Sequence, residues 1–180
     1  AVIRTLGDMV AWFQAIEPSI DLHHFRDATI RKPTSVNPTA PTEQYPEKLR
    51  EADEFYCLIG VAPPLSFETV MRDEVVKGNL VVEHVISENE FVYLRDRPER
   101  ATRWRKYIKA GANVYCYSGT VPCNFINLDE TVYIGKAQSE YGESYAVTES
   151  NNDAVRSWAH EIIDTYRAQS EHLDAEAFVD

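Results

Sequence analysis

FYCLIGVAPPLSFETVMRDEVVKGNLVVEHVI, residues 55–86, is the stretch that decides the fold. It opens with the continuous apolar run FYCLIG and closes with LVVEHVI, which is rich in β-branched residues, and both runs are typical of buried strands. Between them, apolar residues recur at helical spacing from Phe67 to Val75, and Gly78 ends the predicted helix. A strand, a helix and a second strand in this order predict a right-handed crossover between parallel neighbours.

Segments on both sides of this unit add helices to it. Residues 32–46 carry four prolines among Thr, Ser and Asn residues and predict a loop, after which residues 47–52 predict a short helix. Residues 88–110 predict one or two helices, the second beginning near Pro98. A final helix over residues 153–167 follows side chains that suit an N-cap and shows an apolar face.

Four strand-like runs lie between these helices, in the second half of the chain. They are separated by short turns, which is typical of antiparallel neighbours. The runs are residues 113–117, 123–128, 131–136 and 144–148. The predicted fold class is therefore α/β, with one mixed, partly parallel β-sheet flanked by helices and an antiparallel extension towards the C-terminus.

The start of the chain predicts a helix with a wide apolar stripe. Apolar side chains recur at spacings of three and four between Ile3 and Ile16. The domain's own core or a second copy of the chain would cover this stripe equally well. We assign residues 1–17 to a connector or dimerisation helix, residues 18–171 to the α/β domain and residues 172–180 to a frayed tail. The residues assigned to the dimer helix contact are Leu6, Val10 and Phe13.

The composition excludes several classes of protein. The chain has 44% hydrophobic residues but no apolar stretch of roughly 20 residues, so it suits a globular core and predicts no membrane span. Acidic residues outnumber basic ones by 29 to 18, and the formal charge of −11 disfavours nucleic acid as a direct partner. The acidic excess suits a halophile's salty cytosol, and three cysteines without CxxC spacing suit a reducing cytoplasm.

Patterns that carry catalysis or hold a cofactor do not stand out. The turn at Gly60 has too little glycine for a phosphate-binding loop, and the five histidines lack the spacing of a zinc site. Cys116 and Cys123 read as core thiols, with a redox pair across neighbouring strands as the alternative. We predict no metal site, no cofactor and no enzymatic activity. The rival is an unrecognised enzyme that uses Glu83 and His84 as an acid–base pair, although neighbouring strand positions face opposite ways.

Two features could bind an anion, and for each we favour a structural explanation. The helix start at Leu65-Ser66 faces the end of a buried strand, where backbone N–H groups attract negative charge, but an ordinary capped start also explains it. Residues 95–109, RDRPERATRWRKYIK, contain seven basic residues with aromatic residues between them. Because Trp104 falls on the apolar side, we assign it to the core and the basic residues to a solvated helix face.

The order of these features resembles the domain that follows the winged helix in archaeal transcription regulators of the methanogenesis regulatory protein family. The resemblance spans about residues 17–171. Its pieces are FRDATIRKPTSVNPTAP, LREADEFYCLIG, NLVVEHVI, AGANVYCYSGTVPCNFINLDETVYIG and NNDAVRSWAHEIIDTYRAQS. It implies a phospholipase-D-like half unit without the enzymatic signature, which needs a His with Lys two residues later. None of the five histidines is followed in this way, and VPCNFIN replaces an apolar motif often found in the family.

Together these observations predict an effector-sensing and dimerisation domain of a regulator whose DNA-binding winged helix is missing from the chain. We expect a homodimer, contact with DNA only through that winged helix, and no membrane partner. A small polar metabolite is expected to bind near the carboxyl ends of the strands, where ligands sit in open α/β sheets. A ligand-free dimerisation module is the alternative. The predicted ligand contacts are Gly60, Pro64, Ser66, Tyr117, Ser118, Asn124 and Glu149.

Overall fold

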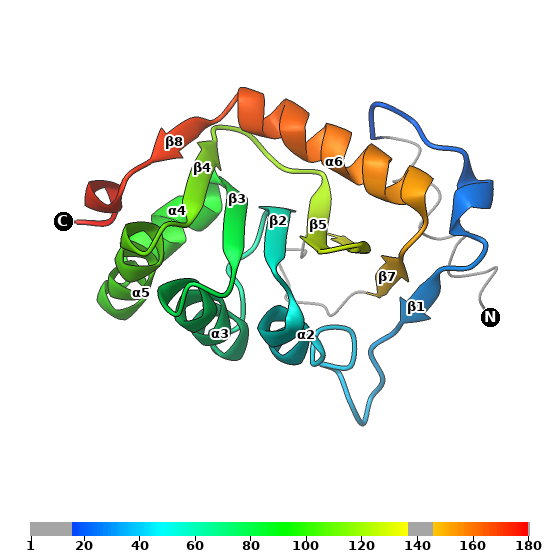
Figure 1. The fold of residues 1–180 in the computed structure, drawn as a ribbon, viewed down its shortest axis with the longest axis horizontal. Coiled ribbons are helices and arrows are strands. Elements are labelled where there is room, and N and C mark those ends of the chain that lie inside the picture. The colour runs from blue at the N-terminus through cyan, green and yellow to red at the C-terminus, as the bar shows by residue number, and fades with distance from the viewer. Residues whose placement is uncertain (1–15, 137–145, 180) are drawn as a thin grey trace.

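One mixed sheet organises the protein, which is described by a computed structural model over residues 16–136 and 146–179. Figure 1 shows this sheet at the centre of the molecule. Its eight described strands are β1 (Thr29–Arg31), β2 (Glu54–Ile59), β3 (Val81–Ser87), β4 (Asn113–Tyr117), β5 (Cys123–Leu128), β6 (Thr131–Lys136), β7 (Val147–Ser150) and β8 (Glu171–Leu173). They lie in the order β1-β7-β6-β5-β2-β3-β4-β8.

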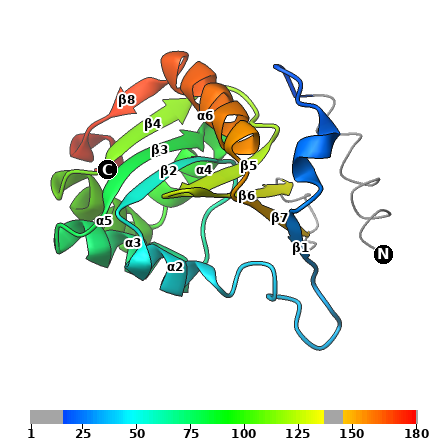
Figure 2. The same ribbon diagram turned by 45° about the vertical axis from the view of Figure 1, so that its right-hand side comes forward.

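Helices cover both faces of the sheet (Figure 2). On one face lie α2 (Tyr45–Glu51), α3 (Leu65–Val76), α4 (Glu88–Arg95) and α5 (Pro98–Lys109). The long helix α6 (Asp153–Ala168) crosses the other face. Two short 3-10 turns complete the described elements, η1 (Leu22–Phe25) and η2 (Ala175–Phe178).

The predicted crossover forms the centre of the sheet. Strand β2 pairs in parallel with β3, where Cys57 lies opposite His84, and β3 pairs in parallel with β4. On its other side β2 pairs antiparallel with β5, and antiparallel pairing continues through β6 and β7 to β1. The predicted fold class is therefore confirmed, with its parallel centre and its antiparallel extension.

Alternating side chains of β2 divide the core into two layers. Phe55, Cys57 and Ile59 are buried in the cluster beneath α2, α3 and α5, whereas Leu58 is buried in the cluster beneath α6. Each layer removes apolar surface from water, which favours folding by roughly 25 cal/mol for every Å². A strand that is buried in this way on both faces needs helices on both, and the chain supplies them.

The structure corrects two details of the sequence interpretation. Cys116 on β4 and Cys123 on β5 do not lie on neighbouring strands, because β2 and β3 separate them, and both thiols are free. The last predicted strand lies at Val147–Ser150, where the expectation was residues 144–148. The predicted helix between Ile3 and Ile16, with Leu6, Val10 and Phe13, lies outside the described residues except for Ile16, which is buried.

The C-terminal segment is ordered, so the prediction of a frayed tail from residue 172 is wrong. Strand β8 pairs antiparallel with β4, placing Leu173 opposite Val114. Beyond it, Phe178 is buried and stacks on Trp104 with 5.9 Å between the ring centroids. A polar tail with one aromatic anchor lacks the periodicity that signals packing, which explains the error.

No helix within residues 16–136 and 146–179 combines the length and the apolar character that crossing a membrane demands.

We predict that Phe178→Ala lowers the free energy of unfolding by about 3 kcal/mol, because the truncation leaves a cavity between Trp104 and Phe91. Urea denaturation followed by tryptophan fluorescence measures the change. The matched control is Val179→Ala, since Val179 is exposed and its truncation should alter stability little. Equal stability of the two variants would contradict the packed tail.

Candidate functional site

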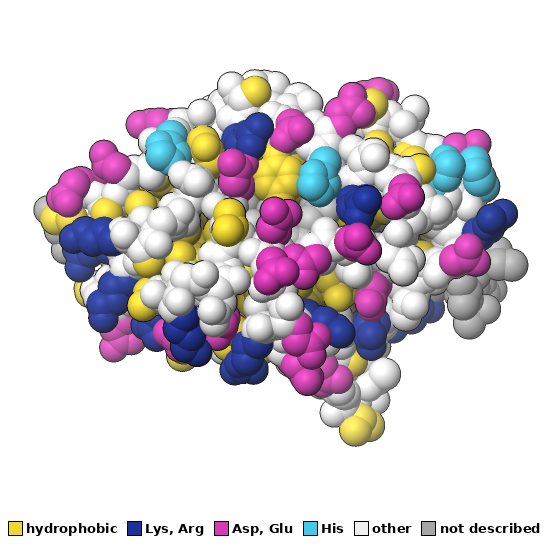
Figure 3. Space-filling view, in the orientation of Figure 1, with side chains coloured by type: hydrophobic (Ala, Val, Ile, Leu, Met, Phe, Trp, Pro, Cys, Tyr) yellow, Lys and Arg dark blue, Asp and Glu magenta, His cyan; other side chains and the backbone are white. Residues whose placement is uncertain are grey.

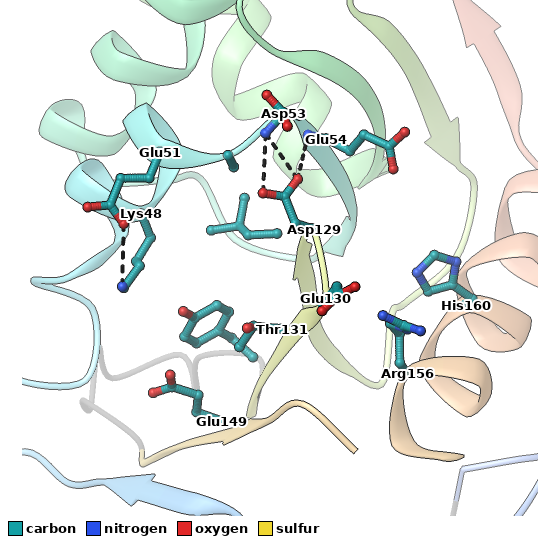
Figure 4. A pocket seen from close by; sticks show the side chains of 13 residues that line it. Lys48, Glu51, Asp53, Glu54, Asp129, Glu130, Thr131, Glu149, Arg156 and His160 are labelled. Atoms are coloured by element: carbon teal, nitrogen blue, oxygen red, sulfur yellow. Dashed lines mark hydrogen bonds and ion pairs between the residues drawn. The ribbon is translucent and has the colours of Figure 1, made fainter. Parts of the chain in front are cut away.

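A groove of about 790 Å³ opens where β2 begins and β5 turns into β6 (Figure 4). Its walls come from the end of α2, the start of β2, the β5–β6 hairpin, β7 and the first half of α6. The lining residues are Lys48, Glu51, Ala52, Asp53, Glu54, Leu128, Asp129, Glu130, Thr131, Tyr133, Glu149, Arg156 and His160. The groove therefore joins side chains from both helical layers at one edge of the sheet.

Asp129 fixes the shape of this groove. It occupies the β5–β6 turn with φ of 52°, a left-handed conformation that Asp tolerates better than most residues. Its carboxylate accepts hydrogen bonds from the backbone N–H of Asp53 at 3.0 Å and of Glu54 at 2.9 Å. In return, the Asp129 N–H donates to the carbonyl oxygen of Glu54 at 3.2 Å. These bonds fasten the hairpin to the beginning of β2.

The lining carries more acid than base. Glu149 pairs with Arg31 at 3.2 Å, and Glu51 pairs with Lys48 at 3.5 Å. Three further carboxylates of the lining form no side-chain hydrogen bond or ion pair with a described residue: Asp53, Glu54 and Glu130. Figure 3 shows acidic side chains gathered around the middle of this face of the molecule. A ligand that carries positive charge or several hydroxyl groups suits such a lining.

Helix α6 adds a histidine to one wall. The ring of His160 lies 5.0 Å from that of Tyr56, and its Nε2 is buried without a hydrogen-bond partner among the described residues. Burial lowers the pKa of His160, so the ring is neutral at pH 7. The Tyr56 hydroxyl donates to Asp164, one turn further along α6. This hydrogen bond adds a polar contact between α6 and the sheet to the apolar packing beneath the helix.

The predicted ligand contacts do not form one site. At the carboxyl end of β2, the N–H of Gly60 donates to the Asn124 side chain at 2.8 Å, and the Ser87 hydroxyl is 3.5 Å from the Gly60 carbonyl oxygen. Tyr117 pairs with Ser87 in the sheet. Glu149 lies at the opposite edge, in the groove of Figure 4.

The remaining predicted contacts are exposed. Pro64 is the residue before α3, Ser66 lies in its first turn, and Ser118 follows β4. Whether any of these residues binds a ligand stays a prediction. The sequence did not predict the groove, because ligands in open α/β sheets are expected at the carboxyl ends of the strands, whereas the groove opens at the amino end of β2.

The Glu83–His84 pair is split between the two faces of the sheet. Glu83 accepts a hydrogen bond from Arg167 of α6, whereas His84 is fully buried on the other face with Nδ1 3.2 Å from the Tyr107 hydroxyl. Burial lowers the pKa of His84 to about 3. The two side chains therefore cannot act together on one substrate.

Two of the three cysteines, Cys57 and Cys123, are also withdrawn from solvent. Burial raises the pKa of the Cys57 and Cys123 thiols, and that of Cys116 to about 11, so the reactive thiolate form is suppressed. Within the part of the chain that the structure describes, no cluster of three or more His, Cys, Asp and Glu side chains is placed to hold a metal ion.

Comparison with known proteins places the chain beside regulators and phospholipase D relatives. The family model for the middle domain of the methanogenesis regulatory protein FilR1 matches residues 38–169. No curated protein sequence matches the chain. TrmBL2, an archaeal chromatin protein with a novel mode of DNA binding, superposes with a TM-score of 0.63 at 14% identity. This match covers 96% of the chain but only 63% of TrmBL2.

Two bacterial proteins share the fold along nearly their whole length. Nuc from Salmonella typhimurium, a phospholipase D family member, has a TM-score of 0.60 at 13% identity, covering 82% of this chain and 99% of Nuc. NucT from Helicobacter pylori has a TM-score of 0.55 at 10% identity, covering 81% of this chain and 98% of NucT. Identities this low show the fold alone, and they confirm the phospholipase-D-like architecture.

We predict that Asp129→Ala lowers the free energy of unfolding by about 2 kcal/mol, because it removes the acceptor of two backbone N–H groups and places alanine in a left-handed turn. Asp129→Asn should cost less, since asparagine keeps an acceptor oxygen and tolerates the turn. Urea denaturation compares both with Glu130→Ala, the exposed neighbour. A loss in Asp129→Ala no larger than in Glu130→Ala would refute the fastening role.

Proposed function

The chain belongs to the FilR1 middle-domain family of methanogenesis regulatory proteins, and from this premise we propose that it is the effector-sensing part of an archaeal transcription regulator. The family match over residues 38–169 carries this proposal. The likeness to TrmBL2, of which the matched part is 63%, agrees with a domain that belongs to a larger DNA-binding protein. In this proposal the acidic surface of the domain keeps it from binding DNA itself.

The groove beside Asp129 is the proposed effector site. Its volume of about 790 Å³ falls in the range of small-molecule sites. The unpaired carboxylates of Glu54 and Glu130 favour an effector with an amine or several hydroxyl groups. Thr131 and Tyr133 in the same lining offer hydroxyls for orientation.

Effector binding would act by bridging two elements that both line this groove. The hairpin is fastened to β2 through Asp129, whereas Arg156 and His160 belong to α6 on the opposite helical layer. A ligand that contacts both binds best to one relative placement of α6 and the hairpin, and so shifts the population toward that placement. A regulator needs this differential affinity to pass a signal to its DNA-binding part.

We further propose that the domain is not an enzyme. The supporting observations are the separation of Glu83 from His84 and the burial of two cysteines, with the pKa of all three thiols raised. In addition, no histidine in the sequence is followed by Lys two residues later, as the phospholipase D signature requires. The likeness to Nuc and NucT concerns the fold and brings no activity with it.

A thermal-shift screen tests the effector site with amines, neutral polyols and carboxylates as three separate panels. We expect a member of the first two panels, at about one hundred times its dissociation constant, to raise the Tm by roughly 5 °C or more. Glu54→Gln combined with Glu130→Gln should remove the shift, because both charges line the groove. Glu176→Gln, an exposed acid outside the groove, is the control and should keep it.

Two results would refute the effector site. One is the absence of any stabilising amine or polyol. The other is a shift that survives unchanged in the double variant, since the ligand would then bind elsewhere.

A homodimer through the start of the chain is the second part of the proposal, and the apolar stripe of residues 3–16 supports it. We expect Val10→Asp combined with Phe13→Asp to convert a dimer to a monomer in sedimentation velocity. Asp8→Asn, a polar position beside the stripe, should leave the dimer intact. A monomeric wild-type chain, or a dimer in the double variant, would disprove the dimer contact.

A further inference from the structure

A second cavity lies where helices α3 and α5 begin. These helices run side by side beneath the sheet (Figures 1 and 2). The cavity measures about 570 Å³ and is lined by Leu65, Arg97, Pro98, Glu99, Arg100 and Arg103. Because α3 leads into β3 and α5 leads into β4, and these two strands are parallel, the amino ends of both helices point to the same edge of the sheet, the edge opposite the acidic groove. Neither helix has a side-chain hydrogen bond capping its amino end.

A buried carboxylate holds two of the three arginines. Glu68 is 1% exposed, and it accepts hydrogen bonds from Arg100 Nη1 at 3.1 Å and from Arg103 Nε at 2.5 Å. Trp104 Nε1 donates to the same carboxylate at 3.1 Å, which confirms that Trp104 belongs to the core. One negative charge therefore positions two guanidinium groups. Because these side chains are already ordered, binding an anion costs less side-chain conformational entropy.

Arg97 borders the cavity on its solvent side. Its guanidinium lies 3.5 Å from the centre of the Tyr93 ring, and Nη1 donates to the Tyr93 carbonyl oxygen at 2.9 Å. Its other donors have no partner among the residues that the structure describes. The three arginines carry three positive charges, and Glu68 and Glu99 carry two negative ones. The net charge at the cavity is therefore +1. The amino ends of two twelve-residue helices add their dipoles to it.

We propose that this cavity binds the phosphate group of a small anionic ligand. The planar guanidinium groups present donors in the geometry that phosphate oxygens accept. Leu65, which is 55% exposed, offers an apolar contact to the body of the ligand. Read separately, the helix start at Leu65-Ser66 and the basic stretch 95–109 each have a structural explanation, but the fold places them in one cavity.

This site goes beyond the proposed effector groove, because it lies at the other end of the strands and selects the opposite charge. The cavity also has the dimensions of a small-molecule site and not of an extended surface. We therefore commit to a phosphorylated small molecule. Duplex DNA is the alternative that the experiment has to exclude.

The test is a titration of the ¹⁵N-labelled chain with inorganic phosphate at constant ionic strength, followed by amide chemical shifts. We expect saturable shifts at Leu65, Ser66 and Phe67, the first turn of α3. Arg97→Gln should weaken phosphate binding roughly fivefold or more, because a charge-assisted hydrogen bond is lost. Lys109→Gln, the same loss of charge at the far end of α5, should leave the affinity unchanged.

Leu65→Glu provides an independent variant, since an exposed residue can be replaced without disturbing the core. It should abolish the shifts by placing a negative charge in the cavity. Shifts that fail to saturate, or equal affinity in Arg97→Gln and the wild type, would overturn the proposal. Shifts of the same amides by duplex DNA but not by phosphate would also overturn it. These outcomes are independent of the amine and polyol panels, so either site can fail alone.

Discussion

Burial of β2 on both of its faces is the constraint on which the rest of the structure depends. Cys57 and Leu58 are inaccessible to solvent on opposite faces, and the backbone of β2 pairs with β3 on one side and β5 on the other. Such a strand demands a helical layer on each face, so α3 and α6 are both required. Both cavities open near the ends of the strands, beyond the reach of these layers.

The central elements could be predicted from sequence because their signals are long. FYCLIG and LVVEHVI are apolar over whole strands, and the final helix repeats apolar residues for four turns. Strands β1 and β8 carry no such signal, since each has three residues and owes its conformation to a partner strand, β7 or β4. The C-terminal segment likewise packs through the single ring of Phe178, so no periodic pattern in the sequence predicts its burial.

The groove was harder to anticipate than the fold. Its lining comes from four separate stretches of the sequence, and no stretch contains a motif. The available signal was the pair of acidic dipeptides, Asp53-Glu54 at the start of β2 and Asp129-Glu130 at the hairpin turn, which antiparallel pairing brings together. The predicted contacts Gly60 and Asn124 do meet, yet Glu149 could be placed only once the order of β5, β6 and β7 was known.

The length of β2 has a consequence for how the two ends of the sheet communicate. A strand rises about 3.3 Å per residue, so the five steps of this six-residue strand keep its ends about 17 Å apart. In physiological salt, Coulomb forces between exposed charges fade over about 8 Å. The charge of a ligand bound at one end is therefore screened from exposed charges at the other end. Any coupling between the two ends must therefore act through displacement of the packed backbone, transmitted along the central strands.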